Sequence, residues 1–428
     1  MLYSLKEKYF MKSNFLLRQL SHGEDAFYKA SLSITTISKI LGDIPYQTLQ
    51  SCFEILLNRH PILQYCVTED EGNRYFTFRP KGKQKVNEIE ISSDCEAHEY
   101  FQKTMNSSLN PQKKLIDITI LKPSKHHQNT IHTYVITNVS HIISDGVSNI
   151  EMLRELLSLC DQTLTGQLFD NDKPEPAKAI PQSIESRLQH RPDGATTEDI
   201  VNQYSEIIKK KTHLTLHADC HTTNHSQIEV LTQTLSEDKT LKILAWCKKR
   251  SLSFNNVFTA ALLMAASSAT NHHSFLVRNA VNLRAQVKPI IKPNEFITGA
   301  TSILTSMTVT NNDNLETLSH KVSLSTNKAL LKAPFFENHI ANKEVLKHMN
   351  VPLAFHISNL GKLNINNEFS SFSLANIIIA PATSCGNTLP IAVTTFNNCL
   401  SITPHGLKEL YPQKFVQSLL SDAISLIS

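Results

Sequence analysis

One short string constrains the fold of this chain more than any other segment. It reads Ser140-His141-Ile142-Ile143-Ser144-Asp145-Gly146-Val147-Ser148. Upstream, residues 129–139 are rich in Thr, Ile, Val and Tyr, and their alternation predicts a strand. Downstream, Ser148 and Glu151 have the spacing of a capping box, and apolar residues then repeat at helical spacing at Ile150, Leu153, Leu157, Cys160 and Leu164. We therefore expect His141 and Asp145 to lie in a tight connection between a strand and a helix.

His141 is the candidate catalytic residue of this connection. A histidine side chain titrates near neutral pH, so it can take a proton from a hydroxyl, amine or thiol when its ring is held in one orientation. Gly146 suits such a connection, because glycine accepts a positive φ and lets another backbone approach closely. The alternative for a lone histidine is structural: it caps the helix or satisfies a buried carbonyl. The Asp-Gly pair that follows favours the catalytic interpretation.

The string also resembles a family signature. His141, Asp145 and Gly146 match the His-x3-Asp-Gly motif of the chloramphenicol-acetyltransferase-like acyltransferase superfamily. This superfamily includes nonribosomal peptide condensation domains, plant acyltransferases, alcohol acetyltransferases and the mycobacterial polyketide-associated acyltransferases. The string is most similar to the alcohol acetyltransferase and polyketide-associated forms, because the condensation-domain form usually carries a second histidine where Ser140 stands.

The resemblance implies an α/β (α+β) fold of two chloramphenicol-acetyltransferase-like domains, each a mixed β-sheet flanked by helices. The two domains would form a V with a central tunnel, and His141 would lie at the centre of that tunnel. We expect the first domain, with the motif, over residues 1–170 and the second over residues 201–428. Residues 171–200 are proline-rich and show little periodicity, which is typical of an interdomain crossover. In such folds a C-terminal segment often crosses back to the first domain.

Two further motifs in the second half of the chain resemble the family. A predicted strand over residues 275–284 ends in Asn-Leu-Arg, and the family's matching arginine forms a salt bridge with the aspartate of the motif. This assigns Arg284 and Asp145 a structural role; the alternative is a strand-end arginine in solvent. Ser358-Asn359-Leu360-Gly361 is similar to a strand end of alcohol acetyltransferase relatives. Ser358 and Asn359 either donate hydrogen bonds to the donor carbonyl or tetrahedral oxyanion, or only shape a turn.

The implied activity is O-acyl transfer by direct attack, without a covalent enzyme intermediate. The donor would be a thioester, either acyl-CoA or an acyl group on the phosphopantetheine of a carrier protein, and the acceptor a hydroxyl-bearing small molecule, sugar or lipid. His141 would remove the acceptor's proton, so the reaction needs neither a nucleophilic side chain nor a permanently bound cofactor. Two alternatives stay open: a condensation-type enzyme that forms an amide from carrier-bound substrates, and a non-catalytic binding relative.

Patterns elsewhere predict supporting elements. Residues 18–24 are similar to the leader with which polyketide-associated members enter their first domain. A helix is expected to end at Arg59-His60-Pro61, where the proline stops it and His60 has a structural role. The remaining expectations are a hairpin over 64–68 and 74–79 in one mixed sheet with strands 86–91 and 115–121, strands over 228–235 and 298–310, and helices that start after Ser236 and Ser253 or cover 314–332 and 411–427.

Four histidines recur at every fourth position beside Cys220, at His213, His217, His221 and His225. On a helix they would stack on one face as metal ligands. Nearby threonines disfavour a helix, and on a strand this spacing leaves neighbouring histidines about 13 Å apart, too far for four ligands on one ion. We therefore expect a polar loop and an exposed strand here, and no metal site.

Composition narrows the functional classes. With 41% hydrophobic and 19% charged residues, the 428-residue chain can form two globular domains. A formal charge of only +4 without a basic patch gives no nucleic-acid signature, and eight dispersed cysteines favour reduced thiols over disulfides. Charges interrupt the N-terminal segment, and the longest apolar run, 257–266, is too short to span a bilayer. We expect a cytoplasmic monomer without a signal peptide or a transmembrane segment, and export by another route stays open.

Overall fold

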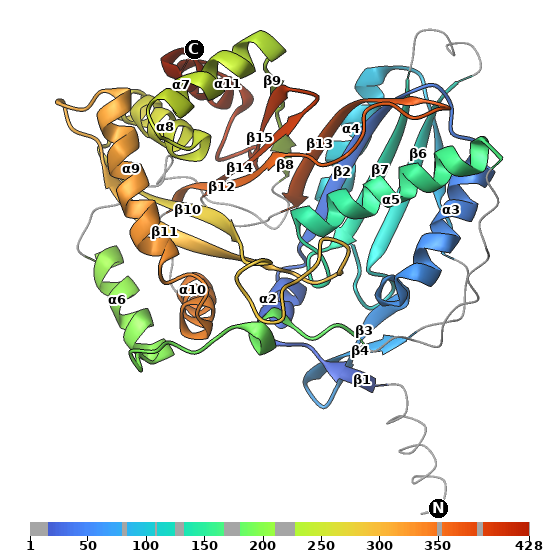
Figure 1. Cartoon of the computed structure of the whole chain (residues 1–428), viewed down its shortest axis with the longest axis horizontal. Coiled ribbons are helices and arrows are strands. Elements are labelled where there is room, and N and C mark those ends of the chain that lie inside the picture. The colour runs from blue at the N-terminus through green and yellow to red at the C-terminus, as the bar shows by residue number, and fades with distance from the viewer. Residues whose placement is uncertain are drawn as a thin grey trace, which may run out of the picture. The chain divides into compact units, whose positions relative to one another are not determined.

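The computed structural model describes residues 16–78, 84–107, 109–124, 132–166, 180–209, 227–348, 353–382 and 388–427. The chain forms two compact units that both combine helices and sheets (Figure 1). Unit 1 comprises residues 1–186, 292–298 and 364–377, and unit 2 comprises residues 187–291, 299–363 and 378–428. Two short segments from the second half of the chain therefore belong to the unit that carries His141.

The main sheet of unit 1 has five strands in the order β13-β2-β7-β6-β5. These strands are β2 (Ser33–Leu41), β5 (Asn87–Ile91), β6 (Ile116–Pro123), β7 (Thr133–Ser140) and β13 (Ser373–Ala382), of which residues 373–377 are in unit 1. β7 pairs antiparallel with β2 and β6, whereas β5 and β6 pair in parallel, so the sheet is mixed.

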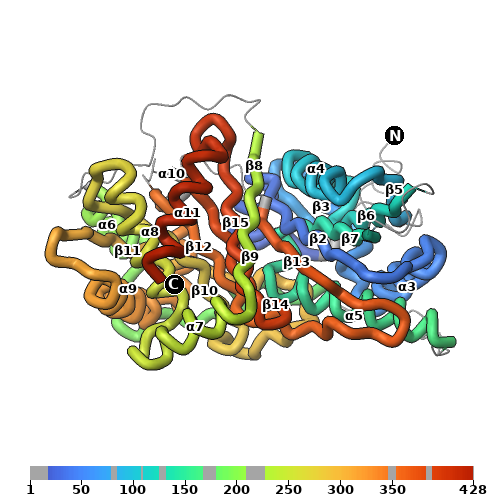
Figure 2. Tube along the Cα trace, turned by 90° about the horizontal axis from the view of Figure 1, so that it is seen from above, coloured from blue at the N-terminus to red at the C-terminus, as the bar shows by residue number. Residues whose placement is uncertain are grey.

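Helices cover both faces of this sheet. They are α3 (Tyr46–Arg59), α4 (Asp94–Asn106) and α5 (Gly146–Leu164), and Figure 2 shows α4 on the opposite face from α3 and α5. All eight residues of β7 are buried as a result. The strand that leads to His141 is thus a central strand of the sheet, which explains its run of Ile, Val and Thr.

A separate three-stranded sheet in unit 1 corrects one expectation. β3 (Tyr65–Asp70) and β4 (Asn73–Phe78) form the predicted hairpin, but β4 also pairs with β1 (Leu16–Gln19), and none of the three joins the main sheet. α3 ends at Arg59 as predicted, and a 3-10 turn over Pro61–Gln64 then precedes β3.

Unit 2 is built on a seven-stranded sheet in the order β11-β10-β12-β14-β15-β8, with β9 also paired to β15 (Figure 2). The strands are β8 (Ile228–Val230), β9 (Gln233–Thr234), β10 (Ser274–Asn282), β11 (Ala300–Thr308), β12 (Leu353–Lys362), β14 (Leu389–Phe396) and β15 (Cys399–Leu407). β12 pairs in parallel with β10 and β14. The single strand expected over 228–235 is divided into β8 and β9.

The helices of unit 2 include four predicted ones and two that were not predicted. The predicted helices are α7 (Glu237–Lys249), α8 (Phe254–Thr270), α9 (Leu315–Leu330) and α11 (Gln413–Ile427), and Ser236 and Ser253 cap the first two as expected. α6 (Thr197–Lys209) begins inside the segment expected to be a linker, and it packs against α10 (Phe336–His348). Buried polar residues hide the pattern of α10, since Asn338, His339 and Asn342 are each at most 3% exposed.

The two units confirm the predicted fold class, in which mixed sheets are flanked by helices. The linker limits at 171 and 200, the V arrangement and the tunnel stay predictions. Within the described ranges, no single helix is long and apolar enough to cross a membrane, although the bent pair of α7 and α8 meets the length and composition criteria together.

Candidate active site

The motif turn, residues 141–145, connects β7 to α5. Backbone hydrogen bonds to residues just before β2 and β6 hold its start. The amide of Ser140, the last residue of β7, donates to the carbonyl oxygen of Leu115 at 2.8 Å. The amide of His141 donates to the carbonyl oxygen of Leu32 at 2.9 Å. Ile143 then donates back to the Ser140 carbonyl at 3.2 Å, which turns the chain. His141 therefore lies directly at the end of the sheet, as predicted.

The N-cap of α5 is Asp145, which corrects the predicted cap. The Asp145 carboxylate accepts from the Ser148 amide at 2.9 Å, and the Ser148 hydroxyl oxygen accepts from the Asp145 amide at 3.0 Å. The Ser148–Glu151 spacing predicts Ser148 as the cap, but Ser148 is the third residue of the helix. Gly146 is the first residue of α5, and it is not among the described glycines with positive φ.

Buried polar groups close the motif turn from within. The Ser144 hydroxyl donates to the Ser140 carbonyl at 2.9 Å. The Asn149 amide group donates to the Ser144 hydroxyl oxygen at 3.0 Å and to the Asp145 carbonyl at 3.1 Å. Ser144 and Asn149 are at most 1% exposed. Hydrogen bonds buried to this degree are costly to break, so they stiffen the turn.

The imidazole of His141 stacks on the ring of Phe27. The ring centroids are 4.3 Å apart and the ring planes differ by only 4°. Phe27 lies on α2 (His22–Lys29). A stacked ring covers one face of the imidazole and restricts its rotation, so the side chain of His141, like its main chain, is held in one orientation.

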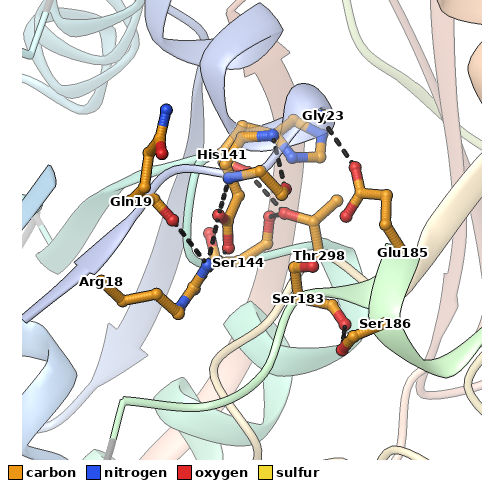
Figure 3. Close-up of polar contacts among 11 residues, drawn as sticks. Arg18, Gln19, Gly23, His141, Ser144, Ser183, Glu185, Ser186 and Thr298 are labelled. Carbon is orange, nitrogen blue, oxygen red and sulfur yellow. Dashed lines mark hydrogen bonds and ion pairs between the residues drawn. The ribbon is translucent and has the colours of Figure 1, made fainter. Parts of the chain in front are cut away.

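The start of α2 is fixed by ionic and capping contacts. Ser21 and Glu24 form a capping box, and Arg18 donates two hydrogen bonds of 2.8 Å to the two carboxylate oxygens of Glu24. The Gly23 amide donates to the Glu185 carboxylate at 2.7 Å, close to His141 (Figure 3). The leader resemblance over residues 18–24 thus marks the helix that carries Phe27.

Thr298 contacts the motif turn from a distant part of the sequence. Its hydroxyl donates to the His141 carbonyl oxygen at 2.5 Å and lies 3.2 Å from the Ser144 carbonyl oxygen (Figure 3). Thr298 belongs to unit 1 and precedes β11, whereas the sequence pattern places it in the strand itself.

His60 contacts both the segment 292–298, which contains Thr298, and helix α5. Its Nε2 lies 2.7 Å from a Glu155 carboxylate oxygen, and Arg59 donates to the other oxygen at 3.1 Å. Burial alone would raise the pKa of the Glu155 carboxyl, but His60 and Arg59 outweigh it and lower that pKa. The His60 ring also packs edge-on against Phe296, with centroids 4.8 Å apart. These contacts fit the structural role expected for His60.

Arg284, in unit 2, follows β10 and has a fixed backbone. Its amide donates to the Asn282 side-chain oxygen at 2.9 Å, and its carbonyl accepts from the Ile291 amide at 2.9 Å. Arg284 is 4% exposed, which does not fit the alternative of an arginine in solvent. The bridge to Asp145 joins residues of different units and stays a prediction.

Ser358 and Asn359 lie within β12 and not at a strand end, which corrects that expectation. The pairing of β12 with β14 shifts register between Asn359 and Gly361. The Asn359 side-chain oxygen accepts from the Gly361 amide at 2.8 Å, and Gly361 has a φ of +66°. Asn359 therefore shapes a bulge in the strand; its role as a hydrogen-bond donor in the reaction stays a prediction.

Comparisons with known proteins identify the family. The family model of the condensation domain matches residues 18–294, and that of the phthiocerol/phthiodiolone dimycocerosyl transferase C-terminus matches residues 225–366. This chain belongs to the condensation-domain family. The match confirms the resemblance drawn from the His-x3-Asp-Gly string, and the family and its relatives include acyl-transferring enzymes.

Solved structures share the fold of this condensation-domain chain at low identity. Polyketide synthase associated protein 5 from Mycobacterium tuberculosis is 16% identical, with a TM-score of 0.71 over 97% of this chain and 99% of that one. Trichothecene 15-O-acetyltransferase from Fusarium sporotrichioides is 13% identical, with a TM-score of 0.76 over 96% and 97%. The first condensation domain of the CDA synthetase is 13% identical, with a TM-score of 0.72 over 94% and 90%.

Phe27 and Thr298 contact His141 in ways that the sequence patterns do not predict. The helix that carries Phe27 could have been predicted, because Ser21 and Glu24 have the spacing of a capping box. No local signal points to Thr298.

The four histidines of the possible metal site, His213 to His225, lie outside the described residues. Among the residues that the structure does describe, no group of three or more His, Cys, Asp or Glu side chains could hold a metal ion.

Proposed function

We propose that this condensation-family protein transfers an acyl group from a thioester donor to a hydroxyl acceptor, with His141 as the general base. The observation that carries this proposal is the fixed imidazole of His141 at the end of β7, stacked on Phe27. Base catalysis requires a proton acceptor whose ring nitrogen is aimed at one place, and such positioning is worth about 10² to 10⁴ in rate. The acetyltransferase and polyketide-associated relatives support the choice of acyl transfer.

The reaction is a direct displacement at the thioester carbonyl. His141 takes the hydroxyl proton while the acceptor oxygen attacks the carbonyl carbon, and a tetrahedral oxyanion forms. The oxyanion then collapses, the carbon–sulfur bond breaks, and the leaving thiolate receives the proton from His141. Ser358 and Asn359 donate to the oxyanion in this proposal, and Arg284 holds Asp145. The donor is acyl-CoA or an acyl carrier protein, used as a co-substrate by a cytoplasmic monomer.

A second candidate is amide formation between carrier-bound substrates. The condensation-domain match over residues 18–294 and the likeness to the CDA synthetase domain favour it. Ser140 argues for the hydroxyl acceptor, because the condensation-domain form of the motif usually has a second histidine there. Dependence on a phosphopantetheinylated carrier and an amine would decide for this candidate. Ligand binding without any turnover would instead indicate a non-catalytic relative.

The test is mass-spectrometric detection of free coenzyme A from acyl-CoA donors that range from acetyl to stearoyl. Generic alcohols and amines are supplied as acceptors, and thiol dyes are avoided because the chain has eight cysteines. Wild-type protein should release coenzyme A with a chain-length preference, and His141→Ala should lower the rate by about 10² to 10⁴.

His320→Ala is the matched control, because His320 is exposed on α9 in unit 2. It should retain the wild-type rate. Equal rates for wild type and His141→Ala would remove His141 from the chemistry. Absence of release from every CoA donor would move the assignment to a carrier-protein donor or to a non-catalytic relative.

A further inference from the structure

The Thr298 hydroxyl holds both ends of the turn that follows β7. It donates at 2.5 Å to the carbonyl oxygen of His141, and the carbonyl oxygen of Ser144 is 3.2 Å from the same hydroxyl. A hydroxyl has one hydrogen, so the shorter contact is the main bond and the longer one completes a three-centre arrangement. Thr298 is 5% exposed, so water does not readily replace it.

Apolar anchors fix Thr298 in this place. Its neighbours Phe296 and Ile297 are 5% and 4% exposed, and the ring of Phe296 packs edge-on against His60. His60 is bonded in turn to Glu155 on α5, the helix that begins at the motif. The segment 292–298 is thus linked through His60 to the helix whose N-cap is Asp145.

The main chain of His141 is held on both sides in consequence. Its amide is bonded to Leu32 on one side, and its carbonyl oxygen is bonded to Thr298 on the other. The Phe27 stack fixes the ring but leaves the backbone free to shift, so the two constraints are different. A displacement of the Cα atom by a fraction of an ångström would move the imidazole relative to an acceptor hydroxyl.

We propose that Thr298 is a positioning residue for His141, one that acts through the backbone of the motif turn and does not touch substrate. This inference rests on the proposed function of His141. The isosteric change Thr298→Val removes the hydroxyl and should lower kcat about 10- to 100-fold with KM changed less than about threefold, because a displaced base retards the chemical step and leaves binding intact. Thr298→Ser keeps the hydroxyl and should retain most of the wild-type kcat.

A double mutant separates this role from a direct one. If Thr298 acts through His141, Thr298→Val should cost little further activity in a His141→Ala background, since the group that it positions is gone. A full additional 10- to 100-fold loss in that background would overturn the proposal. So would wild-type kcat in Thr298→Val itself. Equal activity of His141→Ala and wild type would mark failure of the proposed function, not of this inference.

Hydrogen exchange supplies a readout that needs no activity. Amides of residues 141–149 should exchange faster in Thr298→Val than in wild type, and Thr298→Ser should be close to wild type. The matched control is Thr388→Val in unit 2, where a 7% exposed hydroxyl donates to the Leu353 carbonyl at 3.0 Å. Unchanged exchange over 141–149 in Thr298→Val, or the same increase in Thr388→Val, would refute the positioning role.

Discussion

The motif turn of unit 1 and the β12 bulge of unit 2, residues 358–361, differ in how their backbones are held. In sequence, each has polar residues and then a glycine after an apolar strand. In the turn and the first residues of α5, the side chains of Ser144, Asp145, Ser148 and Asn149 form hydrogen bonds with one another and with the backbone, and Thr298 adds a further hydrogen bond. In the bulge, the Asn359 side chain bonds to the amide two residues on.

The difference separates a rigid turn from a local irregularity of a strand. The turn changes the element from strand to helix and presents a titratable side chain, so many groups are needed to hold it. The bulge only inserts a residue into a strand that continues to Lys362. Among the described residues, similar sequence patterns therefore accompany a turn with many side-chain hydrogen bonds and a bulge with one. The polar residues next to the His-x3-Asp-Gly motif distinguish the turn from the bulge.

The largest expected effect on activity and stability comes from substitution of Arg284, the proposed partner of Asp145. If Arg284 bridges Asp145, Arg284→Ala should lower both activity and stability, because the buried Asp145 carboxylate would then lose its counter-charge. We expect the free energy of unfolding to fall by about 3 to 5 kcal/mol, measured by urea denaturation. The proposed bridge would be wrong if Arg284→Ala were stable and fully active. Arg278→Ala, on the neighbouring strand β10, serves as the comparison.

The next effect tests whether the bulge contributes to the reaction. If Ser358 donates to the oxyanion, Ser358→Ala should lower kcat by about 10² to 10³, the usual cost of one such donor, while the melting temperature stays unchanged. Turnover is measured by release of coenzyme A. A variant with normal kcat would leave Ser358 as part of the bulge alone.

A buried histidine of unit 2, His405, gives the stability of the protein a pH dependence that can be measured. His405 on β15 of unit 2 is 1% exposed, and burial lowers its pKa to about 4 despite the hydrogen bond between its Nδ1 and the Thr403 carbonyl. An unfolded histidine titrates near 6.5, so the unfolded state binds the proton first and stability is lost as pH falls from about 6.5 through 4. The loss should approach roughly 3 kcal/mol.

His405→Gln isolates that contribution. Its free energy of unfolding, measured by denaturation at several pH values, should depend less on pH over this window than that of wild type. His320→Ala, which replaces an exposed histidine of α9, is the control. Parallel pH curves for wild type and His405→Gln would contradict the assignment.

The smallest effect concerns the glycine of the bulge. Gly361 has a φ of +66°, and a Cβ atom added there would meet none of the described residues within 4 Å, so Gly361→Ala would cost only backbone strain. We expect a loss of about 1 to 2 kcal/mol in thermal or chemical denaturation. Gly72→Ala, with a φ of +79° and equally open space in the β3–β4 turn, is the matched control. If the bulge serves the reaction, only Gly361→Ala should also lower kcat.

Local patterns predicted the elements of the site better than the contacts between them. The strand before His141 and the helix after it follow from alternation and helical spacing, yet the cap was misplaced because Asp145 and Ser148 form a nested capping box that the Ser148–Glu151 spacing obscures. Thr298 could not be predicted, since its contact with His141 depends on how the segment 292–298 packs. α10 was missed because it buries polar residues, which removes the apolar period.

The return of residues 292–298 and 364–377 to unit 1 has a consequence during synthesis of the chain. The ribosome releases the strand, turn and helix of the motif early, but Thr298 emerges only after residues 187–291 of unit 2, and the first residues of β13 only after residues 299–363 as well. Unit 1 thus cannot complete its sheet or its motif turn co-translationally as a separate N-terminal piece. A nascent chain halted near residue 290 would therefore lack β13, and its main sheet would expose the edge of β2.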